Sequence, residues 1–208
     1  MANADWFDVL ATLFYIFSFI VSALISSFSY KVYKLTKEKK FRNFSIAFLF
    51  ITLSFVVQAA TNLIIYFNLQ KGSDFILAAI NNGFTGYALL TIAGFFLLAL
   101  LSLKITDIKV ISLVAVLIIV ALFVSPAFIV AFHLILLALL AFLTFNFYKN
   151  CCEKKSLNSK TVFMAFLFMT FAHIFHLAGR YTAPVFIAGN IIQFIGYLAL
   201  LIAILRVK

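Results

Sequence analysis

The sequence contains seven apolar runs, each close to the roughly 20 residues that an α-helix needs to cross the hydrocarbon core of a bilayer. These runs cover residues 7–30, 44–67, 75–103, 110–125, 127–147, 161–179 and 184–205. With 66% hydrophobic and 11% charged residues, the chain has more apolar side chain than one soluble core of 208 residues can bury. The sequence therefore predicts an all-α, polytopic protein with seven transmembrane helices, placed in the cell membrane as a multi-pass protein.

The first run follows the acidic segment MANADWFD and is longer than the apolar part of a signal peptide, so we expect it to be a permanent helix. Basic residues lie mostly on one side of the spans. Six of the 16 lysines and arginines fall in the connection 31–42. Eight more on the same side are Lys104, Lys109, Lys149, Lys154, Lys155, Lys160, Arg206 and Lys208. Only Lys71 and Arg180 lie on the other side.

Cytoplasmic loops of membrane proteins are enriched in Lys and Arg, so this bias predicts an outside amino terminus and a cytoplasmic carboxyl terminus. The net charge of +10 is then a topology signal, because the charges lie in short loops beside anionic headgroups. It does not predict a nucleic-acid partner. The partners expected are the lipid bilayer and a small solute; a cytoplasmic protein docking on the basic loops and a second copy of the chain remain open.

The chain contains two copies of one segment, AFLFIT at 47–52 and AFLFMT at 165–170. The preceding basic connections also match, with Glu38-Lys39-Lys40 corresponding to Glu153-Lys154-Lys155. We therefore expect two parallel three-helix repeats joined by a linker helix. The alternative is that helices rich in Phe, Leu and Ala align by chance. The expected divisions of this single domain are residues 1–105, 106–125 and 126–208.

This 3+1+3 plan with seven helices resembles the broad group that includes the SWEET sugar facilitators and the microbial rhodopsins, and parallel repeats are a known plan of transporters. The resemblance covers topology alone. The facilitators carry prolines inside their helices, whereas Pro126 and Pro184 lie at helix ends here. The last span has no lysine that could bind retinal. Neither activity is therefore implied.

Polar side chains within the spans share one predicted depth. Counted from the outer end of each run, His133, His173, Asn190, Asn81 and Asn62 lie seven or eight residues in, roughly 10 Å below the surface. Four of them have a polar neighbour three or four residues away on the same helix face. Because lipid cannot satisfy such groups, we expect these faces to converge on a pocket in the outer half of the bundle. The alternative is that they hydrogen-bond helix to helix.

The predicted ligand-binding residues are His133, His173, His176, Asn190, Gln193, Gln58, Asn62, Asn81, Asn82, Tyr87 and Arg180, with Tyr87, Tyr181 and Arg180 lining the mouth of the pocket. No Asp or Glu lies within any span, which disfavours ion-coupled transport. The function predicted is therefore facilitator- or receptor-like binding of a small solute. An enzyme is not expected, since no serine nucleophile, Gly-rich phosphate loop or carboxylate pair is evident.

The histidines leave a second function open. His133 with His173 or His176 would provide the two axial ligands of a b-type haem. The three together would instead hold a transition metal such as zinc or copper. Both readings predict neutral imidazoles that face each other. Cys151 and Cys152 are expected to be free thiols, because vicinal cysteines cannot form an ordinary disulfide.

Overall fold

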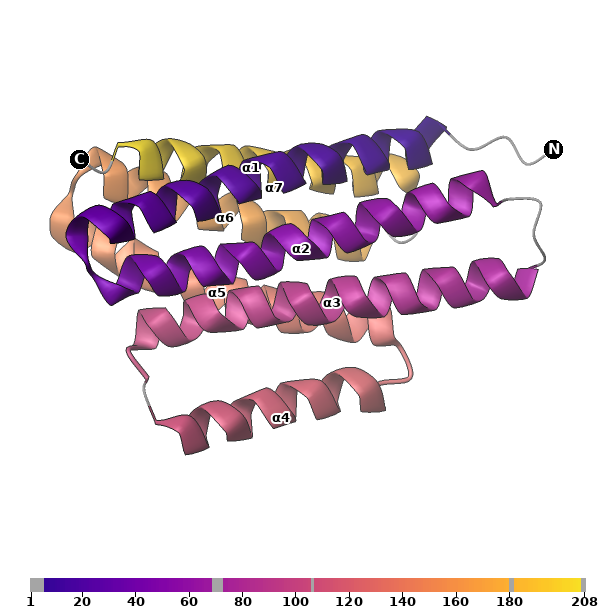
Figure 1. Ribbon diagram of the computed structural model, residues 1–208, viewed down its shortest axis with the longest axis horizontal. Helices are drawn as coiled ribbons and strands as arrows, with labels where there is room; N and C mark the ends of the chain where they lie inside the picture. Colours follow the sequence, from indigo (N-terminus) through magenta and orange to yellow (C-terminus); the bar gives the residue numbers. More distant parts are fainter. Residues whose placement is uncertain (1–5, 69–72, 106, 180–181, 207–208) are drawn as a thin grey trace.

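The computed structural model describes residues 6–68, 73–105, 107–179 and 182–206. Over these ranges the chain forms seven α-helices (Figure 1). They are α1 (Trp6–Thr36), α2 (Lys39–Phe67), α3 (Ser73–Leu103), α4 (Ile108–Val124), α5 (Phe128–Lys154), α6 (Leu157–Ala178) and α7 (Ala183–Leu205). Six of the described helices are long and apolar enough to cross a membrane, which confirms an all-α, membrane-embedded protein.

The helix that differs from the prediction is α4. It has 17 residues and is about 25 Å long, slightly less than a typical span requires. Asp107 begins it, because its side chain accepts a hydrogen bond from the Lys109 backbone N–H at 2.9 Å. Leu122 is its one buried residue. The prediction of seven helices is confirmed, but only six have the length of a span.

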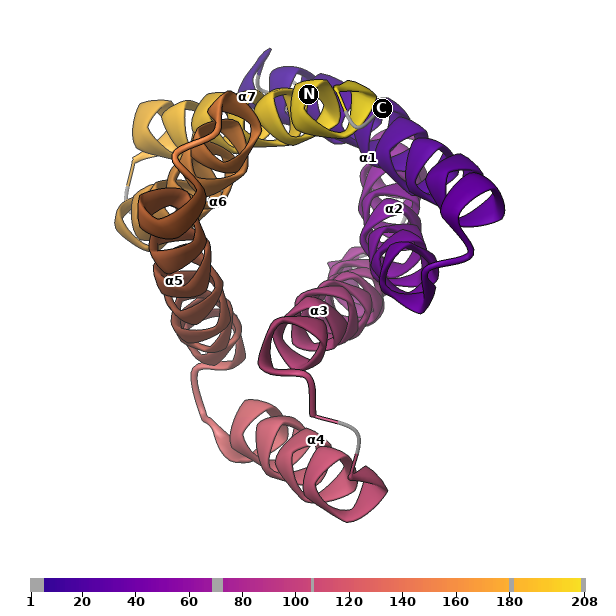
Figure 2. The same cartoon turned by 90° about the vertical axis from the view of Figure 1, so that its left-hand side faces the viewer.

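The six long helices form a closed ring, seen end-on in Figure 2. Around the ring, α1 packs on α2, α2 on α3, α3 on α5, α5 on α6, α6 on α7, and α7 on α1. The main contact of α4 is with α5, and the helix lies outside the ring. The interior of the protein is therefore built by six helices.

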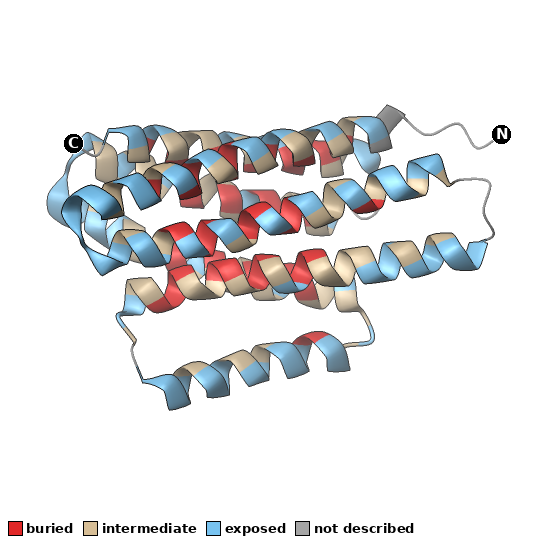
Figure 3. Ribbon diagram, viewed as in Figure 1, coloured by how far each residue is buried: buried red, intermediate tan, exposed pale blue. Residues whose placement is uncertain are grey.

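Aromatic rings fill the interior of this ring. Phe48, Phe55 and Phe132 are fully buried, and Tyr87 and Tyr197 join them through ring contacts such as Phe55–Tyr197, with centroids 5.5 Å apart. Large apolar side chains also cover the outside, and Figure 3 shows the exposed positions on the outward face of each helix. Such a surface is stable in lipid but would aggregate in water.

Small hydroxyl residues hold α1 against α2. Ser26 and Ser45 donate hydrogen bonds to each other's backbone carbonyl oxygens, at 2.9 and 2.8 Å. Farther along, Thr52 donates to the Ser22 hydroxyl at 3.1 Å. Small and hydroxyl residues let membrane helices approach closely, so this contact is a packing device.

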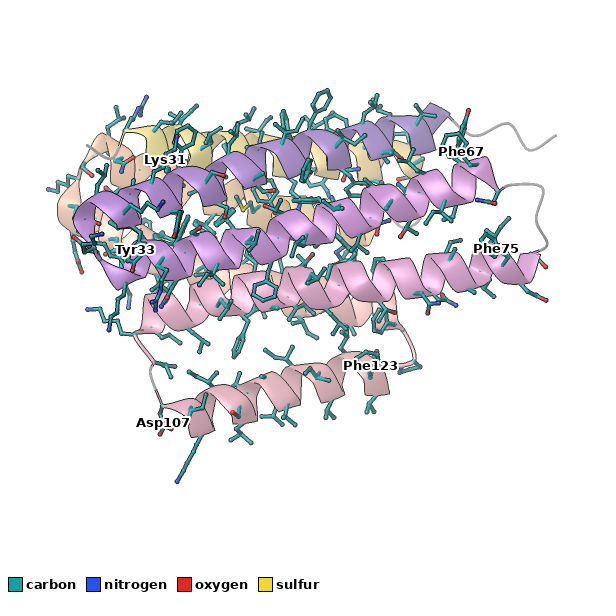
Figure 4. All side chains as sticks on the ribbon, in the orientation of Figure 1. Lys31, Tyr33, Phe67, Phe75, Asp107 and Phe123 are labelled. Atoms are coloured by element: carbon teal, nitrogen blue, oxygen red, sulfur yellow. The ribbon has the colours of Figure 1, made fainter. Side chains whose placement is uncertain are left out.

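The hairpin of α2 and α3 is longer than the hairpin of α6 and α7. These helices have 29 and 31 residues, whereas α6 and α7 have 22 and 23. The difference is about 10 Å of helix, and Figure 1 shows the hairpin projecting beyond the ring. Figure 4 places Phe67 and Phe75 at its tip, and Lys31 and Asp107 at the opposite end of the bundle.

The two halves of the chain share local structure. Gly94 of α3 packs on Ala47 and Ile51 of α2, where an added Cβ would lie 2.8 Å from the Ala47 carbonyl oxygen. Gly196 of α7 packs in the same way on Ala165 and Met169 of α6, at 3.0 Å from the Ala165 carbonyl oxygen. The positions that pack alike, 47 with 165 and 51 with 169, are the positions that align in the two AFLF segments.

The connections before these segments correspond differently from the sequence match. Lys37 and Lys155 are both left-handed, with φ of 57° and 51°, and each follows the end of a helix. Positions 37 and 155 have the same spacing as 47 and 165. Glu38 precedes α2, whereas Glu153 lies inside α5, so the match of the Glu-Lys-Lys motifs was wrong by three residues.

Candidate functional site

Three histidines meet between α5 and α6. His133 lies near the start of α5, and His173 and His176 lie three residues apart near the end of α6, so both face the same neighbour. The Nδ1 atoms of His133 and His173 are 3.2 Å apart. The three ring centroids are separated by 5.4 to 5.6 Å. One nitrogen from each ring lies within 4.8 Å of the other two.

The cluster is buried and its hydrogen bonding is incomplete. His133, His173 and His176 are 6%, 1% and 5% exposed. The Nδ1 pair forms one hydrogen bond, in which one ring donates and the other accepts. Within the part of the chain that the structure describes, the Nε2 atoms of His173 and His176 have no partner. Each buried polar atom without a hydrogen bond lowers the stability of the fold by roughly 1–3 kcal/mol. A bound ligand could satisfy such atoms at this end of the bundle.

Aromatic rings and one glycine enclose the cluster. The Phe132 ring lies 4.9 Å from the His133 ring and 6.4 Å from the His173 ring, and Phe186 of α7 lies 5.0 Å from His176. Gly189 of α7 touches His176, and a Cβ there would lie 2.7 Å from the His176 Nε2 atom. A larger residue at position 189 would displace the imidazole of His176. The absence of a side chain at Gly189 therefore makes room for this ring.

Sequence reasoning did not single out Phe132, Phe186 or Gly189, because a phenylalanine or glycine among so many apolar residues carries no positional signal. Asn190 and Gln193, which it did select, are buried on α7 directly after Gly189. The Asn190 Nδ2 atom has no hydrogen-bond partner among the described residues. These two residues therefore belong to the helix that closes the histidine cluster.

Gln58 and Asn62 are bonded elsewhere. The Gln58 amide donates to the Asn62 side-chain oxygen at 3.2 Å, and the Asn62 amide donates to the Thr12 hydroxyl of α1 at 3.0 Å. Both are half-buried. This chain links α2 to α1, which is the helix-to-helix bonding that the sequence left as the alternative.

The structure does not bring Asn81, Asn82 or Tyr87 to a pocket mouth. Asn81 and Asn82 are exposed on α3, so the expectation that they face inward was wrong. Equal counting from the helix ends assumed level ends, whereas α2 and α3 extend about two turns farther. Tyr87 is buried in the aromatic interior instead. Arg180 and Tyr181 lie outside the described residues.

The geometry of the histidines does not fit a haem. Two axial nitrogens on opposite faces of one iron are about 4 Å apart with the porphyrin between them. The Nδ1 atoms of His133 and His173 are in direct contact, which leaves no room for a ring system. A cavity among the described residues lies between α3 and α4. It has about 270 Å³ and apolar walls, lined by Leu89, Ile92, Ala93, Phe96, Ala115, Ile118, Ile119 and Leu122.

The same geometry fits a single metal ion. Imidazole nitrogens bind transition metals at about 2.0–2.1 Å, and two ligands of a tetrahedral ion are then about 3.3 Å apart. The His133–His173 pair already has this separation. The third nitrogen lies within 4.8 Å, so a rotation of His176 toward the other two rings would complete a three-nitrogen face.

Comparisons with protein-family models, curated proteins and solved structures give no match to this chain.

Proposed function

We propose that the protein binds one transition-metal ion within the membrane, through one nitrogen from each of His133, His173 and His176. The observation that carries this proposal is the approach of three buried imidazoles to within 4.8 Å, with two ring nitrogens left without partners. The two helices bring the three rings together, and binding an ion would need a rotation of His176 and loss of the hydrogen bond between His133 and His173. The function is then metal binding in a carrier or receptor, rather than hydrolysis.

Two other readings have less support. Histidines that only join helices need a pair, and His133 with His173 would suffice; His176 adds a third ring whose Nε2 gains no bond. Solute binding by a polar ring would need Gln58 and Asn62 to be available, but they bond to each other and to Thr12. Gln58 Oε1 and Asn190 Nδ2 also lack partners among the described residues, but the three histidines are the group whose ligand atoms lie within 4.8 Å of one another, so they carry the proposal.

The direct test is the metal content of the purified protein. In a variant with Cys151→Ser and Cys152→Ser, which removes the free thiols, dialysis against Zn²⁺ or Cu⁺ after treatment with a chelator should load one ion per chain, because the three nitrogens form one face. Elemental analysis against protein concentration gives this ratio. Failure of both ions to bind would disprove the proposal.

We further propose that the basic end of the bundle is cytoplasmic and that the histidines lie in the outer half. Cys151 and Cys152, which are free and lie at the basic end, should then react with a membrane-impermeant maleimide only after cell lysis. As control, Asp74→Cys in a variant lacking both native cysteines should react in intact cells, since residue 74 is exposed at the other end. The reverse pattern would invert the topology.

We also propose that the halves form an internal repeat. The support is the equivalent packing of Gly94 and Gly196, the equivalent left-handed residues Lys37 and Lys155, and the order of helices in the ring. A two-fold axis along the bundle would exchange α1, α2 and α3 with α5, α6 and α7. It would also exchange the contact of α3 with α5 for that of α7 with α1. On this proposal, only the second half carries the histidines.

A further inference from the structure

We infer that the ion held by the three histidines is monovalent, Cu⁺ among the ions a cell offers; this inference rests on the proposed metal site. The first reason is the charge of the ligand set. The described residues that gather around the candidate site are three histidines, with no carboxylate or thiolate in the group. Neutral imidazoles cancel none of the charge of an ion, so its full charge stays in the bundle.

The acidic side chains whose exposure the structure describes lie at helix ends and not in the histidine group. Glu38, Asp74, Asp107 and Glu153 are exposed, and each lies before a helix or in its first or last turn. The rings that enclose the histidines, Phe132 and Phe186, are apolar. The cost of burying an ion rises with the square of its charge, so a divalent ion costs roughly four times as much as a monovalent one. The surroundings therefore favour a single charge.

The end of α6 supplies a matching partial charge. His176 lies in the last turn of α6, where the unpaired backbone carbonyls carry about half a negative charge. His133 lies beyond the first turn of α5, so the opposite, positive end of that helix acts on it more weakly. The first turn of α7 carries Phe186 against His176, so the positive end of that helix opposes part of this charge. The neutral ligand set therefore remains the main argument for a monovalent ion.

The coordination chemistry agrees. Cu⁺ is a soft ion that binds imidazole and thioether ligands. Met169 lies one turn before His173 on α6 and is fully buried, but its side chain packs against Gly196 of α7, so the imidazoles are the soft ligands of the site. Hard divalent ions such as Mg²⁺ prefer oxygen ligands, which this helix face does not offer.

The test compares Ag⁺, a redox-inert monovalent probe, and Cu⁺ with Zn²⁺. It requires a variant with Cys151→Ser and Cys152→Ser, because the two free thiols at the end of α5 would bind soft ions themselves. In that background, Ag⁺ and Cu⁺ should each bind once per chain, and Zn²⁺ should bind at least about 100-fold more weakly. X-ray absorption at the copper edge should show nitrogen ligands with at most one sulfur.

Each outcome separates the two proposals. If Zn²⁺ binds once per chain as tightly as Ag⁺, and this binding is lost in His173→Leu, the metal site stands and the monovalent inference is wrong. If neither ion binds, both proposals fail. If Ag⁺ binding survives in the His133→Leu/His173→Leu/His176→Leu variant, the ion is held elsewhere, and both proposals are again overturned.

Discussion

Replacing His133, His173 and His176 together by leucine should abolish metal binding and leave the metal-free protein at least as stable as the wild type. Binding should be lost because leucine has no ligand atom, and the affinity should fall by more than the roughly 10–100-fold typical of changes to groups that support a ligand. Stability should be kept because leucine fills the space. Two buried nitrogens without partners, each costing roughly 1–3 kcal/mol, are removed at the same time.

The matched control is Phe132→Leu. Phe132 is fully buried and its ring contacts the rings of His133 and His173, but it offers no ligand atom. This variant should lose stability, through a cavity that costs on the order of 1–3 kcal/mol, and still load one ion. Thermal unfolding in detergent and metal content measure the two effects. Histidines that only join the helices would give the opposite result, with a large loss of stability in the triple variant and no binding to lose.

The fold could be predicted from the sequence to the level of its helices. Runs of apolar residues near the length of a span determine where helices lie in lipid, and all seven predicted runs overlap the seven described helices. The position of α4 outside the ring could not be predicted. Its sequence is as apolar as those of its neighbours. When a helix is apolar on all faces, its sequence does not show which face packs against the other helices.

The histidine cluster could be predicted by counting residues. His133 and His173 lie equally far from the ends of their helices, and α5 and α6 are neighbours, so equal counting placed the rings together. The same count misplaced Asn81 and Asn82. The ends of α2 and α3 lie about two turns beyond those of α6 and α7, and hydropathy does not reveal such a difference, because the extension is also apolar.

The internal match illustrates a second limit of sequence comparison. The two Glu-Lys-Lys motifs align by letter, but helix ends and left-handed residues show a different correspondence, with 37 opposite 155. The contacts of a loop lysine such as Lys40, which pairs with the exposed Glu38 beside it, are local and do not fix its register against another helix. Gly94 and Gly196 are constrained by contact with the neighbouring helix, so the proposed repeat is aligned on them rather than on the lysines.

This correspondence identifies where a second metal site can be built. The spacing between 37 and 155 places Tyr15, Phe55 and Gln58 at the positions of His133, His173 and His176, and that between 94 and 196 places Tyr87 at the position of Gly189. The rings of Tyr15, Phe55 and Tyr87 are 6.2 to 6.4 Å apart. If the proposed repeat holds, the first half has an aromatic cluster at the positions of the histidines, and the Tyr87 ring corresponds to Gly189.

The substitutions Tyr15→His, Phe55→His, Gln58→His and Tyr87→Gly, made together, should raise the metal content from one ion per chain to two. Glycine at position 87 makes room for the new imidazole at 58, as Gly189 does for His176. The matched control carries leucine in place of the three new histidines, keeps Tyr87→Gly, and should bind one ion. Binding of one ion at His133, His173 and His176 would show that each of the two variants is folded. If the variant with all four substitutions is folded but still binds a single ion, the two halves are not equivalent. The internal repeat would then not explain the matched segments.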